Sequence, residues 1–563
     1  MVDEELIKNI QATFSLYGLK LSRTLGHSVA KELLHINESE KDQWLTGVIE
    51  QILSQNLKDP HVEVDHVKIA ITDFMRSDIL KETETKLNVI DAFEIPKMSY
   101  DLSKKKFVLH KVSMDLYSEV TQKTVIFKDR FEYIKYRILR HESFILRFFG
   151  GDLVSKIKLT EIESLESLNK AENIYLLGLI SELFENQYFL EDPGGSIRIN
   201  LNKAIFQDGL ILEGSIVIIK ANFSHGVLNV KEIGFPPAES PENSRADFGD
   251  ANTFGGPHPT LLKLSEKLKV LEQSDEKARM IFLSDLWLDR TIVLDKFKLL
   301  LEAFIDFPPS AFVICGNFLS FPENEFSPVA MKDGFKRLAD LIVQYPSIKE
   351  SSKFIFVPGP CDLGAPKIVP RRPLSKFAIE DIQKAIPGAI FASNPCRIQY
   401  YTKEIVVFRE DMLIKMCRKT IRFPSGIESN IPYQFAKSII CQGHLIPLPL
   451  PASPVYWKHD YALRLHPTPD VIVIADQYEP YWTVFSDCHV INPGSFPNSQ
   501  RKYCSTGNQA SKVEPYESLL SIERGCTLDS ARKHRKPFMP LLFLFLVRRM
   551  RDILYRDMKT RKI

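Results

Sequence analysis

Four runs of consecutive apolar residues, each followed by polar or turn-forming residues, constrain the fold of this chain more than any other feature. The runs are Met280–Leu283, Ala311–Cys315, Phe354–Val357 and Val471–Ala475. Near-continuous apolar runs are typical of strands buried on both faces, and sites in such domains lie beyond the carboxyl ends of the strands. Residues 280–497 therefore predict an α/β domain with a site at its strand ends.

Residues 1–75 predict a small helical domain. Trp44, Leu45, Val48, Ile49, Ile52 and Leu53 recur at helical spacing and would form one wide apolar face. Asn37 followed by Glu40 fits a capping box at a helix N-terminus.

Residues 171–235 predict a β-barrel of the OB type. Pro193-Gly194-Gly195 is a strong turn signal, and Ser196–Leu201 alternates polar and apolar residues as a half-buried strand does. Five short strands with a helical interruption near Ala204 would suit this fold. Its cations are sparse and interleaved with acids, which favours a structural or protein-docking role over binding of single strands. They are Arg198, Lys203, Lys220 and Lys231.

The remaining segments are less regular. Residues 76–170 form a mixed segment or linker, with a short basic run at Ser103–Lys106 that we interpret as solvated. Residues 236–279 are a linker leading into the α/β domain, and residues 498–563 form a basic tail.

The distribution of charge argues against a stand-alone DNA-binding protein. The tail holds 15 Lys and Arg against 6 Asp and Glu, whereas the rest of the chain holds 58 basic and 65 acidic residues. Because cations drive binding to phosphates, an acidic body is a poor binder of DNA. We expect contact with DNA mainly through a partner.

Cysteine usage and hydropathy narrow the class further. None of the eight cysteines forms a C-x-x-C pair, which argues against zinc fingers and disulfide frameworks and suits a reducing compartment. The acidic start Met1–Glu5 predicts no signal peptide, and no apolar run reaches the ~18–20 residues of a membrane span.

The strand-end loops follow the order of the ligand loops in binuclear-metal phosphoesterases, but with different residues. Those enzymes carry D-x-H, G-D, G-N-H-D, a lone His and G-H-x-H, which hold two metal ions that activate water. The corresponding positions here are Asp285, Trp287, Asn317, Pro360, Cys361, His444, Asp476 and Tyr478. Only Asp285 and His444 retain ligand types. Two ligands cannot hold a binuclear centre, and Trp287 would fill much of its volume, so we predict no catalytic residues, no metal and no cofactor.

Other interpretations of these loops remain open. Asp362 and Asp476 could form a compensated metal site, or the chain could lack phosphoesterase ancestry altogether. His444 by itself is more typical of a hydrogen-bonded structural histidine than of a ligand.

Several longer motifs point to one family. They are Asn252–Gly256, Gln442–Pro449, Pro454–Trp457, Leu463–Asp470 and Asn492–Phe496. In these motifs the chain resembles the B subunits of eukaryotic DNA polymerase epsilon, over roughly residues 1–497. The resemblance implies a multidomain α+β protein with an N-terminal helical domain similar to the lid of AAA+ ATPases, an OB-fold and an inactive calcineurin-like phosphoesterase domain.

The resemblance also implies a function. Such subunits are nuclear, non-catalytic scaffolds in chromosomal replication and repair. Their OB and phosphoesterase-like domains hold the zinc-bearing C-terminal domain of the catalytic subunit, and the helical domain, here residues 1–75, tethers the replicative helicase through GINS. The zinc would belong to that partner.

Three rival functions stay open, as does the nature of the tail. The chain could be an active metal-dependent phosphoesterase or 3′-exonuclease, the B subunit of polymerase delta or alpha, or an independent binder of single strands through residues 171–235. The helical domain is not expected in the delta subunit. After Pro497 the family continues through a β-rich segment, whereas residues 498–563 are basic and unlike that segment. The tail could come from a divergent isoform or from a mis-assembled sequence.

Overall fold

The computed structural model describes residues 4–497 with short gaps. The gaps are 34–40, 55–60, 63, 65, 68–69, 71–85, 102–105, 111–114, 145–146, 150–151, 155–156, 166, 247, 249–250, 259–260, 276–278, 365–366 and 424–429. The capping box at Asn37–Glu40 and the tail 498–563 thus lie outside the described residues. The chain divides into two units, Met1–Thr85 and Lys86–Ile563, and each is described by itself.

In the first unit, the structure gives the bounds of three helices, which lie around one apolar core. They are α1 (Glu4–Leu16), α2 (Arg23–Leu33) and α3 (Lys41–Ser54). Val48, Ile49 and Ile52 of α3 are fully buried and pack with residues of α1 and α2. The predicted apolar face of this helix is therefore present. It is narrower than expected, because Leu53 at its margin is 43% exposed.

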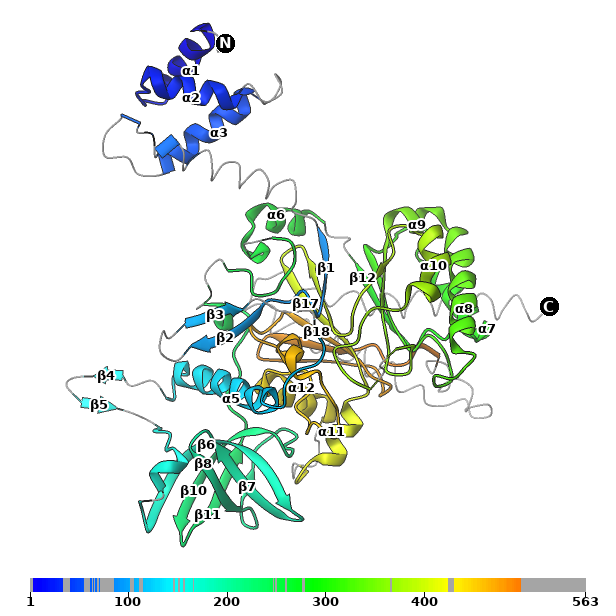
Figure 1. The fold of residues 1–563 in the computed structure, drawn as a ribbon. Helices are drawn as coiled ribbons and strands as arrows, with labels where there is room; N and C mark the ends of the chain where they lie inside the picture. The colour runs from blue at the N-terminus through cyan, green and yellow to red at the C-terminus, as the bar shows by residue number, and fades with distance from the viewer. Residues whose placement is uncertain are drawn as a thin grey trace, which may run out of the picture. The chain divides into compact units, whose positions relative to one another are not determined.

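The second unit contains two sheets packed face to face between two layers of helices (Figure 1). The four-stranded sheet is parallel and runs β12 (Met280–Ser284), β13 (Ala311–Cys315), β14 (Lys353–Val357), β15 (Ile390–Phe391). The mixed six-stranded sheet runs β1 (Leu87–Asp91), β16 (Cys396–Tyr400), β17 (Lys403–Arg409), β18 (Val471–Ala475), β20 (Cys488–Asn492), β19 (Tyr481–Phe485).

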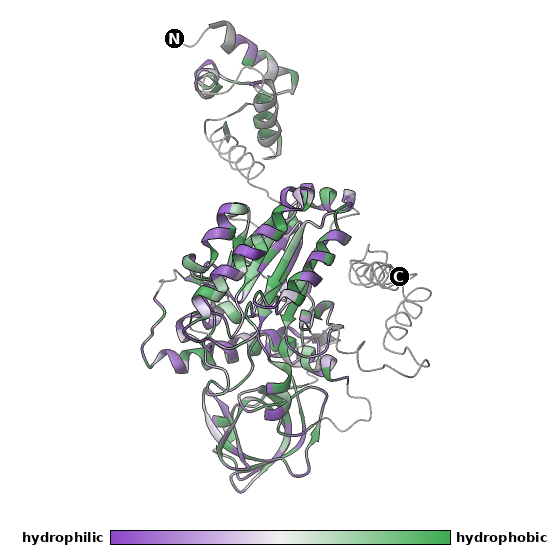
Figure 2. Cartoon of the chain, turned by 90° about the vertical axis from the view of Figure 1, so that its right-hand side faces the viewer, coloured by the Kyte–Doolittle hydropathy of each residue, from purple (hydrophilic) through white to green (hydrophobic). Residues whose placement is uncertain are grey.

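Helices cover the outer face of each sheet. Against the four-stranded sheet lie α7 (Thr291–Ala303), α8 (Ser327–Val343), α9 (Pro346–Ser351) and α10 (Lys376–Ala385). Against the six-stranded sheet lie α11 (Leu413–Lys419) and α12 (Ile431–Gln442). The interior strands are apolar and the helices carry their hydrophilic residues outward (Figure 2). Among the described residues, no helix combines the length and apolar character needed to cross a bilayer.

This layering explains the continuous apolar runs in the sequence. Phe312 and Ile314 of β13 pack against the helices, whereas Val313 and Cys315 pack against the other sheet. Both faces are buried, so no polar alternation appears. The fourth apolar run, β18, lies in the six-stranded sheet rather than beside the other three.

The structure shows strands and helices in residues 86–170 and 236–279, which the sequence predicted only as a mixed segment or linker and as a linker leading into the α/β domain. Strand β1 pairs antiparallel with β16, Leu87 opposite Tyr400. A hairpin, β2 (Lys97–Asp101) and β3 (Lys106–His110), lies beside helix α5 (Gln122–Arg140) (Figure 1). Further elements are β4 (Arg147–Phe149), β5 (Asp152–Val154) and α6 (Glu266–Ser274). Thr253, Phe254 and His258 are buried. The described parts of residues 86–170 and 236–279 therefore belong to the second unit.

The predicted barrel is present. Its strands are β6 (Lys170–Phe184), β7 (Gln187–Asp192), β8 (Gly195–Asn200), β9 (Ile205–Phe206), β10 (Ile216–Ser224) and β11 (Val227–Gly234). They enclose a separate apolar core. The expected helical interruption near Ala204 is wrong, because a turn leads there into the two-residue strand β9, which pairs with β11.

Helix α12 joins the barrel to the α/β body through buried hydrogen bonds. The Gln442 amide donates to the carbonyl of Ile216 and accepts from its N–H, both at 2.8 Å. Ser438 Oγ accepts from the N–H of Leu210 at 2.8 Å. Because these backbone groups have no access to water, their pairing couples the barrel tightly to the body.

We expect Gln442→Ala to lower the free energy of unfolding of the full chain by about 2 kcal/mol, because it leaves two buried backbone groups of Ile216 without partners. Urea unfolding measures the loss. Gln434→Ala is the matched control on the same helix: its Oε1 is buried but has no hydrogen-bond partner among the described residues, so the cost should stay below about 1 kcal/mol. Equal losses in the two variants would contradict this assignment.

Candidate functional site

The carboxyl ends of strands from both sheets meet around one buried guanidinium. Arg409, the last residue of β17, is fully buried. Its Nη2 donates to Asp285 Oδ1 at 2.9 Å, and its Nη1 donates to Asp411 Oδ1 at 2.8 Å. Nε donates to the carbonyl of Gly316 at 2.5 Å, and Nη1 also reaches that of Ala475 at 3.1 Å. One side chain thus joins the carboxyl ends of β12, β13, β17 and β18.

Asp285 and Asn317 form the centre of this cluster. The N–H of Asn317 donates to Asp285 Oδ1 at 3.0 Å, and its side-chain amide lies 3.3 Å from the same oxygen. Asp285 Oδ2 is buried and has no hydrogen-bond partner among the described residues. Burial opposes the charge of Arg409, but Asp285 and Asp411 outweigh it and raise the pKa of the guanidinium. The arginine is therefore held as a cation.

Asp362 closes the cluster from the β14 loop. Its two oxygens accept from the N–H groups of Phe318 at 2.8 Å and Gly359 at 2.7 Å. Burial nevertheless raises the pKa of this carboxyl to about 6. Its oxygens thus serve the backbone of two neighbouring loops.

Asp476 lies after β18 and holds the start of α11. Oδ2 accepts from the N–H groups of Met412 and Leu413 at 2.7 and 2.9 Å, and Oδ1 accepts from that of Tyr478. Unpaired N–H groups at a helix start favour such a carboxylate. Burial raises the pKa of Asp476. Its oxygens therefore serve the backbone as well.

The other predicted positions lie at the margin of the cluster. Trp287 packs, partly buried, against the core under α7–α10, and Tyr478 packs against the core under α11 and α12. Pro360 is half-buried and Cys361 exposed; the N–H of Cys361 donates to Asn317 Oδ1. The structure thus corrects one expectation: the side chain that occupies the space between the carboxylates is Arg409, not Trp287.

His444 belongs to a different cluster. Its Nδ1 accepts from the N–H of Ile446 at 3.0 Å, and its Nε2 lies 3.3 Å from Asp460 Oδ1. Asp460 also accepts from Arg130 of α5. Burial and the nearby Arg130 lower the pKa of His444. These partners give it the contacts of a structural histidine.

The donor set does not fit the metal pair of the phosphoesterases. Oδ1 of Asp285 accepts from a guanidinium, both oxygens of Asp362 and Asp476 accept from backbone N–H groups, and His444 faces Asp460. In the described part of the chain, no group of three or more His, Cys, Asp or Glu side chains is arranged to hold a metal ion. No catalytic step through a metal follows from this arrangement.

The sequence reasoning missed Arg409. A signal existed: Arg409, Glu410 and Asp411 follow directly on the apolar run Ile405–Phe408. Three charged residues after an apolar run are equally typical of a strand that ends in a solvent-exposed loop. Its burial depends on the second sheet, which the apolar runs alone did not reveal.

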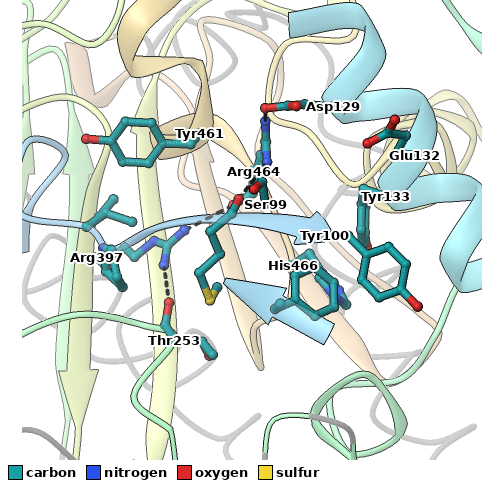
Figure 3. A pocket seen from close by; sticks show the side chains of 14 residues that line it. Ser99, Tyr100, Asp129, Glu132, Tyr133, Thr253, Arg397, Tyr461, Arg464 and His466 are labelled. Atoms are coloured by element: carbon teal, nitrogen blue, oxygen red, sulfur yellow. Dashed lines mark hydrogen bonds and ion pairs between the residues drawn. The ribbon is translucent and has the colours of Figure 1, made fainter. Parts of the chain in front are cut away.

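A pocket lined by both polar and apolar side chains lies between the β2–β3 hairpin, α5 and the segment Tyr461–His466 (Figure 3). Arg464 donates to Asp129, and Arg397 donates to the carbonyls of Thr253 and Phe254. Both ring nitrogens of buried His466 have no hydrogen-bond partner among the described residues. Its ring packs 4.2 Å from Tyr133, centroid to centroid. Burial and the arginines around it hold the pKa of His466 well below its usual range; these are Arg137, Arg140, Arg245 and Arg464.

This pKa predicts an acid-labile contact. Below about pH 6.5 the unfolded state binds a proton at His466 while the folded state does not, so stability falls as pH drops. We expect the free energy of unfolding to fall by at most about 1.4 kcal/mol per pH unit below that value. Urea unfolding of His466→Phe should show a pH slope smaller by that amount. Identical slopes for variant and wild type would contradict the prediction.

Comparison with known families assigns most of the chain. The family "DNA polymerases epsilon N terminal" matches residues 2–74, "DNA polymerase epsilon subunit 2-like, OB-fold domain" matches 120–237, and the family of the DNA polymerase alpha/epsilon B subunit matches 280–483. The solved structure of an archaeal phosphodiesterase aligns with 40% of this chain and 87% of its own at 13% identity. Its TM-score of 0.21 is too low for an argument about the fold.

Curated relatives extend over nearly the whole length. The chain is 40% identical to DNA polymerase epsilon subunit 2 of Homo sapiens, over 89% of this chain and 96% of that protein. It is 36% identical to the Drosophila melanogaster protein of the same name, over 88% and 94%, and 36% identical to the DNA polymerase epsilon B subunit of Arabidopsis thaliana, over 79% and 87%. These relatives match the chain over most of its length and of their own. The chain therefore belongs to the DNA polymerase epsilon subunit 2 family.

Proposed function

We propose that the chain is a nuclear accessory subunit of the DNA polymerase epsilon complex in chromosomal replication and repair, with no catalytic centre of its own. The observation that carries this proposal is the 40% identity over 96% of the human subunit. The match of residues 2–74 to the epsilon-specific N-terminal family favours epsilon over the alpha and delta B subunits.

The cluster around Arg409 supports the absence of catalysis. Two-metal hydrolysis needs carboxylates and imidazoles free to bind cations and an activated water. Here a fully buried guanidinium contacts Asp285, and backbone N–H groups use the oxygens of Asp362 and Asp476. The phosphoesterase-like body would serve as an inactive calcineurin-like frame.

The coupled barrel and body support a docking role. Gln442 and Ser438 of α12 hold barrel strands through buried hydrogen bonds, so both parts can present one continuous surface. In this proposal, the barrel and the body bind the zinc-bearing C-terminal domain of the catalytic subunit. Residues 1–75, a helical domain similar to the lid of AAA+ ATPases, bind the GINS part of the helicase. DNA would be reached mainly through the complex. The division into domains 1–75, 171–235 and 280–497 is part of this proposal.

Co-purification tests the docking role. We expect the full chain, and the chain ending at residue 497, to retain the C-terminal domain of the catalytic subunit at physiological salt. A chain lacking residues 1–85, which form a separate compact unit, should retain that domain and lose GINS. A full-length chain that captures neither partner would refute the proposal.

A hydrolysis assay tests the rival function. We expect no manganese-dependent cleavage of a phosphodiester or of a DNA 3′ end by the full chain. Turnover above background that Asp285→Asn abolishes would establish an active phosphoesterase and overturn the non-catalytic assignment.

A further inference from the structure

We propose that the guanidinium of Arg409 has taken over the structural task of the metal ions that phosphoesterases hold between their strand-end carboxylates. The inference rests on the proposed non-catalytic function. It adds that a positive charge at this place is still required, and that the protein now supplies it from β17.

The guanidinium of Arg409 lies where the carboxyl ends of several strands meet. Its four acceptors lie at the carboxyl ends of four strands of two different sheets. A metal pair joins such loops through several ligands at once, because each ion accepts several oxygens. Arginine has five N–H donors in a fixed fork and can serve several acceptors in the same way, whereas a lysine ammonium is a compact point charge with three donors.

The second argument is the charge balance. Asp285 is fully buried and Asp411 lies partly buried beside it, so the carboxylates need a cation in place of solvent. Asp285 Oδ2 is buried without a partner in the described part of the chain. Its Oδ1 alone receives the guanidinium and the N–H of Asn317, so this carboxylate depends on Arg409 for its counter-charge.

The third argument is a contrast with another buried arginine. Arg397 is also buried, but its hydrogen bonds go to the backbone carbonyls of Thr253, Phe254 and Arg464. Removal of Arg397 would leave neutral carbonyl groups without a donor, whereas removal of Arg409 would leave carboxylates without a cation. Arg397 is therefore the control for a guanidinium that packs and hydrogen-bonds without replacing a metal.

Thermal unfolding of Arg409→Ala tests the inference on the full chain. We expect the Tm to fall by about 10 °C, because a buried carboxylate loses its cation. Millimolar Mn²⁺ or guanidinium ion should restore several degrees in this variant and leave the wild-type Tm unchanged. Adding Asp285→Asn to Arg409→Ala should abolish the restoration. Arg397→Ala should lose Tm and gain nothing from either cation.

The opposite results would overturn it. These are an unchanged Tm in Arg409→Ala, no restoration by either cation, or equal restoration in Arg397→Ala. If Arg409→Ala does not fold, Arg409→Lys and Arg409→Met take its place. The inference requires a higher Tm with Lys, which keeps the charge, and fails if Met equals or exceeds it. Because Tm reports neither turnover nor polymerase binding, its failure is distinct from failure of the proposed function.

Discussion

Arg130→Met should lower the free energy of unfolding by about 3–5 kcal/mol, one of the largest losses that the structure predicts. Arg130 of α5 donates to both oxygens of Asp460, and both side chains are buried. Burial alone would raise the pKa of Asp460, but Arg130 and His444 outweigh it and hold the pKa well below its usual range. The variant leaves this carboxylate charged, buried and without its arginine.

Urea unfolding at pH 7 measures that loss, and Lys128→Met is the control on the same helix. Lys128 is mostly exposed, and its ion pair with Glu132 is long, at 3.8 Å. Lys128→Met should therefore lower the free energy of unfolding by less than about 0.5 kcal/mol. The double variant Arg130→Met/Asp460→Leu should be more stable than Arg130→Met, since it removes the unpaired charge.

The pH dependence gives a second reading of the same contact. The depressed pKa of Asp460 contributes wild-type stability that is present above its unfolded value and lost as pH falls. Without Arg130 that carboxyl protonates readily in the folded state. The difference between wild type and Arg130→Met should therefore shrink from pH 7 to pH 4; a constant difference would contradict this account.

Gly359→Ala should cost about 3 kcal/mol, at the upper end of the usual range for overpacking. A Cβ at Gly359 would lie 2.4 Å from Asn317 Oδ1, 2.8 Å from the carbonyl carbon of Gly316 and 2.9 Å from the N atom of Asn317. Two of these are backbone atoms, so the loops after β13 and β14 would have to separate. That movement would also disturb Arg409, which binds the carbonyl of Gly316.

Gly388→Ala provides the matched control in the same body. The nearest atom to its Cβ is Lys353 Nζ at 3.3 Å, the far end of a side chain that can move away. We expect a change below about 1 kcal/mol for Gly388→Ala in urea unfolding. A small cost for Gly359→Ala as well would show that the two loops tolerate separation.

The site was predictable in part, for an identifiable reason. Asp285, Asn317 and Asp476 each follow an apolar run, and the carboxyl ends of parallel strands gather at one edge, so their loops were expected to meet. They do meet, through Arg409 and backbone hydrogen bonds. His444 follows helix α12 instead, and the structure places it with Asp460 in another cluster.

Several local elements of this protein follow from its amino-acid order alone. Runs buried on both faces, helical spacing in α3 and the turn at Pro193-Gly194-Gly195 depend on neighbours a few residues away, so they can be read along the chain. Which distant segments meet is settled by the folded unit instead. Strand β1 joins β16 some 300 residues on, and Arg409 becomes buried because two sheets close over it. Pairing and burial of this kind depend on the packing of the whole unit, which no local pattern encodes.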